Sequence, residues 1–222
     1  MIKRVVMIRR RPGMAVADFQ AYWLGEHPRL VTRLPGLVRY VQSHTLPGVY
    51  RHRQPLWDGI VEVWFASAEA RRALRGTPEL AAVEADEARF IDRAAMRVLD
   101  IEEHVVVDGD WPRPGVKSIE FIRRREGMAR DAFDAYWRDV HGPLAAGIPQ
   151  LRRYVQNHLL PAAWTSGREP VHDGLAITWF DDRAALRAAA ETDAYRATRD
   201  DEPNFLTVPS PVILATEHVI LA

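Results

Sequence analysis

The sequence predicts an α+β protein made of two tandem domains, and three observations support this. Residues 3–47 recur as residues 117–161, offset by 114 positions, and about half of the aligned residues are identical. Each copy alternates short β-branched runs with amphipathic helical runs in the same order. A segment rich in Gly, Pro and Asp separates the copies at 109–115. The repeat is longer than the roughly 20–50 residues of stacking repeats. We therefore expect domains at 1–108 and 116–222, joined by a linker at 109–115.

The first elements of each copy are a strand and a long helix. The apolar strand covers 3–10 in the first copy and 116–124 in the second, and Gly13-Met14 marks the turn that follows. Phe19, Trp23, His27 and Leu30 then recur at spacings of four and three, which is typical of one helical face. We expect a helix over 16–34 because the following Pro-Gly pair stops it.

The remaining elements follow in the order strand, strand, helices, strand. A β-rich run ends in a proline, a polar loop comes next, and a third strand opens with Asp-Gly. Alanine-rich helical sequence precedes the closing strand. In the first copy these segments are 37–46, 48–56, 58–65, 68–74, 79–92 and 98–107; in the second they are 151–160, 162–171, 173–180, 183–190, 193–201 and 212–221.

This βαββαβ order is the ferredoxin-like pattern, in which helices cover one face of a four-stranded antiparallel sheet. The other face of such a sheet needs a partner. We expect the two copies to pack sheet to sheet, as the subunits of a two-fold dimer would.

Composition limits the classes of partner. The 222 residues carry a formal net charge of zero, so the long-range field of a nucleic-acid-binding or membrane-surface protein is not expected. Apolar residues make up 47%, enough for a core in each half. There is no cysteine, which excludes disulfides and thiolate chemistry. The N-terminal apolar run is too short for a signal peptide, and no run reaches the ~18 residues of a membrane span. We expect a cytoplasmic protein.

Three short sequence elements resemble a known family. The pattern Gly-Met, Phe-x-x-Tyr-Trp-x-x-x-His and Leu-x-Arg-Tyr-Val-Gln-x-His occurs in both copies. It resembles the EthD family of the dimeric α/β-barrel superfamily, whose members usually pair. The resemblance implies an internally fused, pseudo-two-fold dimeric α/β barrel, with further homodimerisation left open. Relatives include aromatic polyketide cyclases, lactone isomerases, small monooxygenases and hydroxynitrile lyases, so the family predicts the fold better than the reaction.

The histidine that ends the helix motif, His27 or His141, is the first catalytic candidate. Imidazole titrates near neutrality, so a placed histidine can give or take a proton. The helix end favours the imidazolium, while burial opposes it. The alternative is a structural histidine that bonds a carbonyl and fixes the corner between helix and strand.

The second strand supplies further candidates, His44 and His158. Alternation along a strand puts Tyr40, Gln42 and His44 on one face, and Tyr154 and His158 occupy the same positions in the second copy. A tyrosine with a histidine suits the removal of a carbon-bound proton while an oxyanion is stabilised. The alternative is a wet end of the sheet. We expect His104 and His218, on the closing strands, at a surface or edge.

Two carboxylates lie mid-strand in only one copy each. Glu62 aligns with Ile177, and Glu120 aligns with Val6. A carboxylate in an apolar strand is paired, solvated or raised in pKa. Each is therefore a candidate general acid or base, and a salt bridge to an arginine is the simpler alternative.

Aromatic side chains recur at matched positions and are candidates for the wall of a substrate pocket. The alternative is that they fill the core. They are Tyr22, Trp23, Tyr40 and Trp64, with Tyr136, Trp137, Tyr154 and Trp179 in the second copy. No closely spaced His/Asp/Glu motif indicates a metal site, and no nucleotide-binding or serine-hydrolase motif is present.

These observations predict a cofactor-independent enzyme that acts on a small apolar or aromatic molecule, polyketide-like or a lactone. The reaction would be an isomerisation, cyclisation or lyase-type elimination that depends on proton transfer by histidine. Two alternatives stay open. One is a binding protein for an apolar metabolite or haem, and the other is an accessory protein of an oxygenase system.

Overall fold

The computed structural model describes residues 1–164 and 170–222, which form two units. The first unit holds Met1–Asp100 and Glu217–Ala222, and the second holds Ile101–Thr216. The predicted α+β class with tandem ferredoxin-like halves is confirmed. Part of the loop predicted at 162–171, residues 165–169, lies outside the described residues.

The sheet of the first unit has β3 (Gly59–Phe65) at its centre. β1 (Ile2–Ile8) and β2 (Leu37–Thr45) both run antiparallel to β3. β4 (Arg97–Asp108) begins in this unit, where Asp100 bonds Arg4 of β1.

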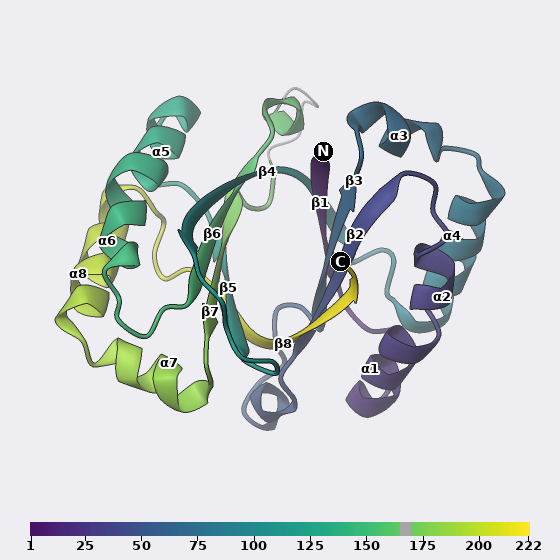
Figure 1. The fold of residues 1–222 in the computed structure, drawn as a ribbon, viewed down its shortest axis with the longest axis horizontal. Helices are drawn as coiled ribbons and strands as arrows, with labels where there is room; N and C mark the ends of the chain where they lie inside the picture. The colour runs from purple at the N-terminus through teal and green to yellow at the C-terminus, as the bar shows by residue number, and fades with distance from the viewer. Residues whose placement is uncertain (165–169) are drawn as a thin grey trace. The chain divides into compact units, whose positions relative to one another are not determined.

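Four helices cover one face of this sheet (Figure 1). They are α1 (Val16–Gly25), α2 (Pro28–Val31), α3 (Ala68–Ala73) and α4 (Pro78–Phe90). The Thr77 hydroxyl caps α4 by accepting a bond from the Leu80 amide at 3.3 Å. A short 3₁₀ helix, Pro47–Arg51, occupies the start of the segment predicted as a loop.

The helix predicted over 16–34 is broken beside His27. It stops at Gly25 and resumes at Pro28, which has no N–H to continue the ladder. The His27 amide instead reaches the Tyr22 carbonyl, five residues back, at 3.3 Å. Such wide turns gather at functional sites. The break turns the backbone at the position of the candidate histidine.

The second unit has the strand order β8-β5-β7-β6-β4. Its first four strands follow the ferredoxin-like order, and the part of β4 in this unit lies beside β6. The closing strand of the first sequence copy thus pairs with the second strand of the other copy. The strands are β5 (Val116–Ile122), β6 (Arg153–Leu159), β7 (Gly174–Phe180) and β8 (Val212–Leu221).

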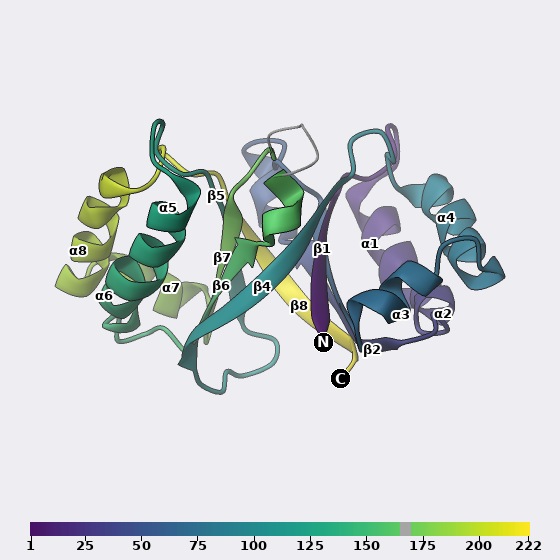
Figure 2. The same ribbon diagram turned by 90° about the horizontal axis from the view of Figure 1, so that it is seen from above.

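Helices also cover one face of the second sheet (Figure 2). The helix that carries the candidate histidine is continuous but contains a π-helical turn, Trp137–His141, at the position of the break in the first unit. The helices are α5 (Arg130–Tyr136), α6 (Gly142–Ala146), α7 (Arg183–Ala190) and α8 (Asp193–Asp201), with 3₁₀ turns at Pro161–Trp164 and Glu202–Asn204.

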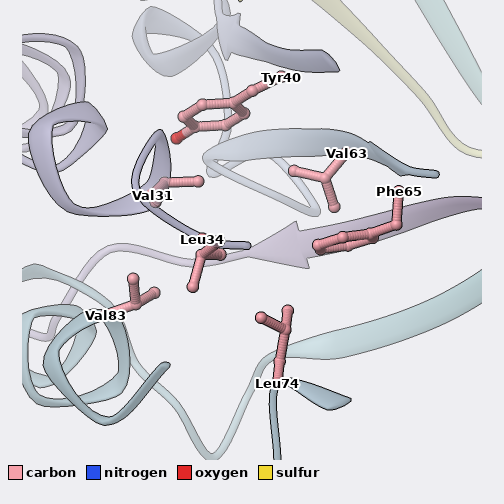
Figure 3. Packing of buried hydrophobic residues seen from close by; sticks show 7 residues of the cluster. All are labelled: Val31, Leu34, Tyr40, Val63, Phe65, Leu74 and Val83. Carbon is pink, nitrogen blue, oxygen red and sulfur yellow. The ribbon is translucent and has the colours of Figure 1, made fainter. Parts of the chain in front are cut away.

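The core of each unit lies between helices and sheet. In the first unit one cluster joins Val31 and Leu34 of the helix side to Tyr40, Val63 and Phe65 of the sheet (Figure 3). Burial of these side chains removes apolar surface from water and fixes the helices on the sheet.

The Asp-Gly that opens the third strand has a packing reason. A Cβ added at Gly59 would lie 2.2 Å from the ring of Trp23. The Trp23 indole thus lies directly on the backbone of β3, which only glycine permits. The same approach occurs between Gly174 and Trp137.

Candidate functional site

A pocket of about 500 Å³ lies in the first unit, between the sheet and helices α2 to α4. Its wall is largely apolar, and the polar groups that reach it come from several elements. Apolar enclosure with a few polar groups is the usual form of a small-molecule site. The titratable lining residues are His27, Tyr40, Glu84, Glu87, Arg4, Arg71, Arg72, Arg75 and Arg93.

His27 is held by a carboxylate from helix α4. Its Nδ1 lies 2.9 Å from Oδ2 of Asp86, and the Tyr22 hydroxyl donates to Oδ1 of the same carboxylate at 2.5 Å. The ring of Phe90 packs 4.9 Å away, edge to face. Since the carboxylate accepts, Nδ1 carries the proton of the neutral ring and Nε2 keeps the lone pair.

Burial decides the charge of His27. Desolvation lowers its pKa from the ordinary value, and the hydrogen bond and charge of Asp86 oppose this without overcoming it. The helix macrodipole, which we expected to favour the imidazolium, does not outweigh this desolvation. His27 is therefore a neutral base whose Nε2 has no partner among residues 1–164 and 170–222.

The second unit repeats this arrangement. Nδ1 of His141 lies 2.9 Å from Oδ2 of Asp201, and the Tyr136 hydroxyl donates to Oδ1 at 2.6 Å. Sequence reasoning missed both aspartates. Asp86 and Asp201 recur at an offset of 115 residues in helical segments that otherwise differ, and this recurrence is the signal that identifies them.

Glu87 is a second titratable group of the pocket that the sequence did not reveal. Burial raises the pKa of Glu87 to about 7, and Arg93, whose Nε lies 3.5 Å from Oε2, opposes the rise. A carboxyl poised near neutrality exchanges protons readily. The pocket thus holds two titratable groups, His27 beside α2 and Glu87 on α4, that are far apart in the chain.

The Tyr-Gln-His row of β2 faces the helices. The Gln42 amide nitrogen donates to the Tyr40 hydroxyl at 2.6 Å and to the Trp23 carbonyl at 2.8 Å, and its oxygen accepts from Nε2 of His44 at 2.9 Å. Burial raises the pKa of Tyr40, which keeps its proton. Tyr40 reaches the pocket, whereas His44 lies outside the lining.

His44 is packed as a neutral ring. It stacks on Trp23 with centroids 4.1 Å apart and planes 6° apart. Burial, with a smaller contribution from His218, lowers the pKa of His44 to about 3. The ring of His218 lies 4.6 Å from that of His44 and is half-buried. We expected His218 at a surface or edge, so its contact with the buried ring of His44 differs from that expectation.

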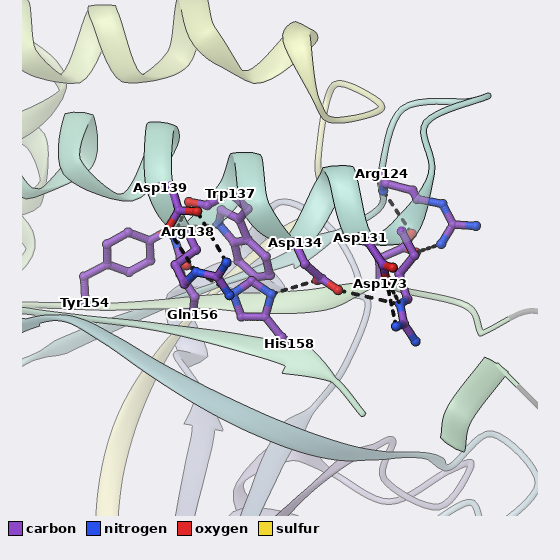
Figure 4. Close-up of polar contacts among 11 residues, drawn as sticks. Arg124, Asp131, Asp134, Trp137, Arg138, Asp139, Tyr154, Gln156, His158 and Asp173 are labelled. Carbon is purple, nitrogen blue, oxygen red and sulfur yellow. Dashed lines mark hydrogen bonds and ion pairs between the residues drawn. The ribbon is translucent and has the colours of Figure 1, made fainter. Parts of the chain in front are cut away.

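His158 has a different environment from His44 (Figure 4). Its Nδ1 contacts Asp134 at 2.9 Å, and its Nε2 contacts the Gln156 oxygen at 3.1 Å. Both ring nitrogens of His158 thus face oxygen acceptors, whereas only Nε2 of His44 does so among the residues that the structure describes. The first unit has Gln20 at the position of Asp134, and Gln20 bonds the Thr45 carbonyl instead.

The two mid-strand carboxylates are ion-paired. Glu62 binds Lys3 at 2.8 Å with both side chains buried, and it lies on the strand face opposite Val61 and Val63, which line the pocket. Glu120 binds Arg199 at 3.1 Å. Glu62 is thus not a pocket residue.

Among the aromatic candidates of the first unit, only Tyr40 lines this pocket. Trp23 and its counterpart Trp137 are fully buried in the core. Trp64 and Trp179 lie under the ammonium groups of Lys3 and Lys117, at 4.7 and 4.8 Å. Tyr154 bonds the Trp137 indole at 3.0 Å, and Tyr22 and Tyr136 bond the aspartates described above.

The second unit carries an ion-pair cluster at positions that line the pocket of the first. The alignment of the two copies pairs Glu120 with Val6, Arg199 with Glu84, and Glu202 with Glu87. The three residues of the first unit all line its pocket. Nη1 of Arg199 lies 3.1 Å from Glu120 and 2.6 Å from Glu202. Burial, followed by the charge of Glu120, raises the pKa of Glu202 to about 8. The two halves therefore differ where the pocket lies.

Residues 1–164 and 170–222 contain no cluster of three or more His, Cys, Asp or Glu side chains with the spacing of a metal site. In the same residues, no helix has the length and apolar character needed to cross a bilayer.

Comparison with solved structures shows the same fold in distant proteins. An anthrone oxidase-like protein aligns with a TM-score of 0.63 at 12% identity, over 99% of this chain and 92% of its own. A protein from Lactobacillus acidophilus NCFM with a provisional monooxygenase assignment aligns with a TM-score of 0.58 at 11% identity, over 97% of this chain and 93% of its own. A mutant chlorite dismutase from Candidatus Nitrospira defluvii aligns with a TM-score of 0.55 at 12% identity, over 99% and 91%. At these identities the likeness establishes the dimeric α/β-barrel fold class alone.

No curated protein matches the sequence significantly. The sequence model of the EthD domain matches twice, at residues 11–94 and 125–208, and so covers most of both copies. The helix motif with His27 and His141 and the second strand lie inside these matches. The chain belongs to the EthD domain family and carries that domain as a tandem pair.

Proposed function

We propose that the pocket of the first unit binds a small, largely apolar molecule and transfers a proton on it without a cofactor. The observation that carries the proposal is the presence of two titratable groups with opposite pKa shifts in one apolar pocket. Burial lowers the pKa of His27 and raises that of Glu87 to about 7. Environments that separate acid from base in this way are typical of catalytic pairs.

The roles follow from the bonding. Asp86 fixes the Nδ1–H tautomer of His27, so Nε2 accepts the proton. Glu87 in its protonated form returns a proton at a second position. The Tyr40 hydroxyl accepts from Gln42, which leaves its own proton to bond a developing oxyanion. Removal of a proton beside a carbonyl by His27 and delivery of the Glu87 proton at another position makes the net reaction an isomerisation, after which His27 loses its proton to water and Glu87 regains one from water. The removal step alone is also the first step of a cyclisation or an elimination.

A specific observation supports a second candidate, a non-catalytic binding protein. The His-Asp-Tyr contact also occurs in the second unit, where the position of Glu87 is taken by the arginine-bound Glu202. If the contact serves only to hold the histidine-bearing segment against α4 or α8 in both units, the pocket binds a ligand without changing it.

Deuterium exchange separates the two candidates. The probe is tetralone, an enolisable apolar ketone, whose exchange in D₂O is followed by NMR against the uncatalysed rate. We expect the protein to accelerate exchange, and His27→Gln to reduce the acceleration at least ~100-fold. His141→Gln is the matched control and retains the rate. Full exchange in both His27→Gln and Glu87→Gln would refute the proton-transfer role, and ligand binding without any acceleration would establish the second candidate.

A further inference from the structure

The pocket of the first unit carries more positive than negative charge. Five arginines line it, Arg4, Arg71, Arg72, Arg75 and Arg93, against two glutamates. One of these glutamates, Glu87, has a pKa raised to about 7 by burial and is only partly ionised near neutrality. Arg72 pairs with Glu69, and Arg93 pairs with both glutamates. The positive charge available to an anionic group therefore comes from Arg4, Arg71 and Arg75, of which the first two approach Asp100.

Two of the arginines share a single carboxylate. Arg4 forms a two-pronged bond to Asp100, with Nε at 2.8 Å and Nη2 at 3.0 Å. Arg71 approaches the same carboxylate only to 3.6 Å, and its buried Nε has no hydrogen-bond partner within the described part of the chain. A buried guanidinium N–H without an acceptor is unfavourable, and a bound anion relieves it.

The second copy shows that these arginines are not needed for the fold. At the positions of Arg4, Arg71, Arg75 and Arg93 it carries Ser118, Leu186, Ala190 and Val208. The strand and helices at or next to these positions form in both units. Only Arg72 has an arginine counterpart, Arg187. The arginine set is therefore a feature of the first unit that the shared fold does not require.

We propose that the ligand of this pocket is an apolar molecule with one anionic group, and that Arg71, supported by Arg4, binds that group at one end of the cavity. The apolar body then lies along the core side chains toward His27 and Tyr40. This inference rests on the proposed function, because it names the substrate class of the same pocket. A planar guanidinium binds carboxylate or phosphate with two parallel bonds, so both groups belong to this class.

The test is displacement of a neutral fluorescent probe, phenylnaphthylamine, from the whole protein. The competitors are naphthoate, naphthyl phosphate and neutral naphthalene methanol, which share one apolar body. We expect naphthoate or naphthyl phosphate to bind about tenfold tighter than the alcohol, a difference of about 1.4 kcal/mol. The better of the two anions identifies the group.

The variant Arg71→Leu, which carries the residue of the second copy, removes this preference and leaves the affinity for the alcohol unchanged. Arg29→Leu, at an exposed position outside the pocket, is the matched control for loss of one positive charge and keeps the preference. Arg75→Ala, at an exposed rim position, reduces the preference less and covers the case in which Arg71→Leu does not fold.

Equal binding of acid and alcohol by the wild-type protein would overturn the anionic class, and so would an unchanged preference in folded Arg71→Leu. If neither the neutral probe nor any of the three competitors binds, the pocket is not a site for small apolar ligands. If tetralone exchange still depends on His27 while the anion preference is absent, the proposed proton transfer stands and only this inference falls.

Discussion

Nδ1 of His27 lies 2.9 Å from Oδ2 of Asp86, and this contact joins the break between α1 and α2 to helix α4. The residues are 59 positions apart in the chain. The contact fixes both the tautomer of the base and the position of the helix that carries Glu87.

Replacing the aspartate tests this double role. Asp86→Asn removes the charge that both Tyr22 and His27 bond, and we expect a loss of about 1–3 kcal/mol in the free energy of unfolding. The matched variant Asp201→Asn loses a similar amount, because Asp201 bonds His141 and Tyr136 in the same way, with a further bond from Asn204. Only Asp86→Asn slows tetralone exchange. Urea unfolding and exchange rates check this, and equal rates in both variants would contradict it.

The lowered pKa of His27 predicts a pH dependence on the acid side. The unfolded chain binds the proton at the ordinary pKa of 6.5, whereas the buried ring binds it only at lower pH. The contribution of neutral His27 to the free energy of unfolding is therefore fully present above about pH 6.5, and it decreases as the pH falls toward the pKa of the folded state. Asp86→Asn lowers that pKa further and widens the window. NMR titration of the His27 ring protons measures it, and a pKa above 6.5 would contradict the prediction.

Glu87 predicts the opposite dependence. Its pKa is about 7 in the folded protein against 4.5 in the unfolded chain, so the native state holds a proton that the unfolded chain has lost. This term reduces stability as pH rises from 4.5 to about 7, by an amount on the order of 3 kcal/mol. Glu87→Gln abolishes the decrease. Thermal unfolding across this range is the measurement, with Glu84→Gln as the more exposed control. If the stability of Glu87→Gln still decreases over this pH range, the decrease comes from another group.

Arg199 holds the ion-pair cluster of the second unit. Arg199→Met leaves Glu120 and Glu202 without their shared cation, and we expect a loss of about 2 kcal/mol at pH 8, an amount that allows for the partial exposure of Arg199. At pH 5 the loss is smaller, because burial raises the pKa of Glu202 to about 8 and this carboxyl is then protonated. Arg196→Met removes an exposed pair and leaves stability unchanged. An equal loss at both pH values would show that packing, not charge, is responsible.

Gly59 tests the contact between Trp23 and β3. In Gly59→Ala the new Cβ would lie 2.2 Å from the indole and 3.2 Å from the Ser43 carbonyl, so the ring must move. We expect a loss of about 1–3 kcal/mol in urea unfolding. Gly25→Ala is the control, because nothing lies within 4 Å of its Cβ and alanine favours the helix by up to ~1 kcal/mol. An unchanged midpoint in Gly59→Ala would disprove the close packing.

The sequence predicted the elements of the fold well because most of their signals are local. Alternation along β2 placed Tyr40 and His44 on one face, and the structure shows both on the helix side. The break at His27 was not predicted, although Pro28 follows it, because the run of apolar spacings continues through the break. The pairing of β4 with β6 was also beyond local signals, because nothing in a closing strand itself indicates that a strand of the other copy will pair with it.

The site was predicted only in part. The helix motif identified His27, but Asp86 and Glu87 belong to a helix rich in charged residues, where local sequence does not show which side chain faces inward. Glu62 was a candidate because it is charged within a strand, yet strand alternation directs it to the face that holds Lys3.

The sequence alone determined the duplication, the order of strands and helices, and the family, because repeats, periodicity and motifs are properties of the chain itself. Only the tertiary structure decided which carboxylate meets which histidine and which half carries the described pocket. Those outcomes depend on contacts between segments far apart in sequence, where a few substitutions such as Glu84 for Arg199 decide whether a charge lines a cavity or joins an ion-pair cluster.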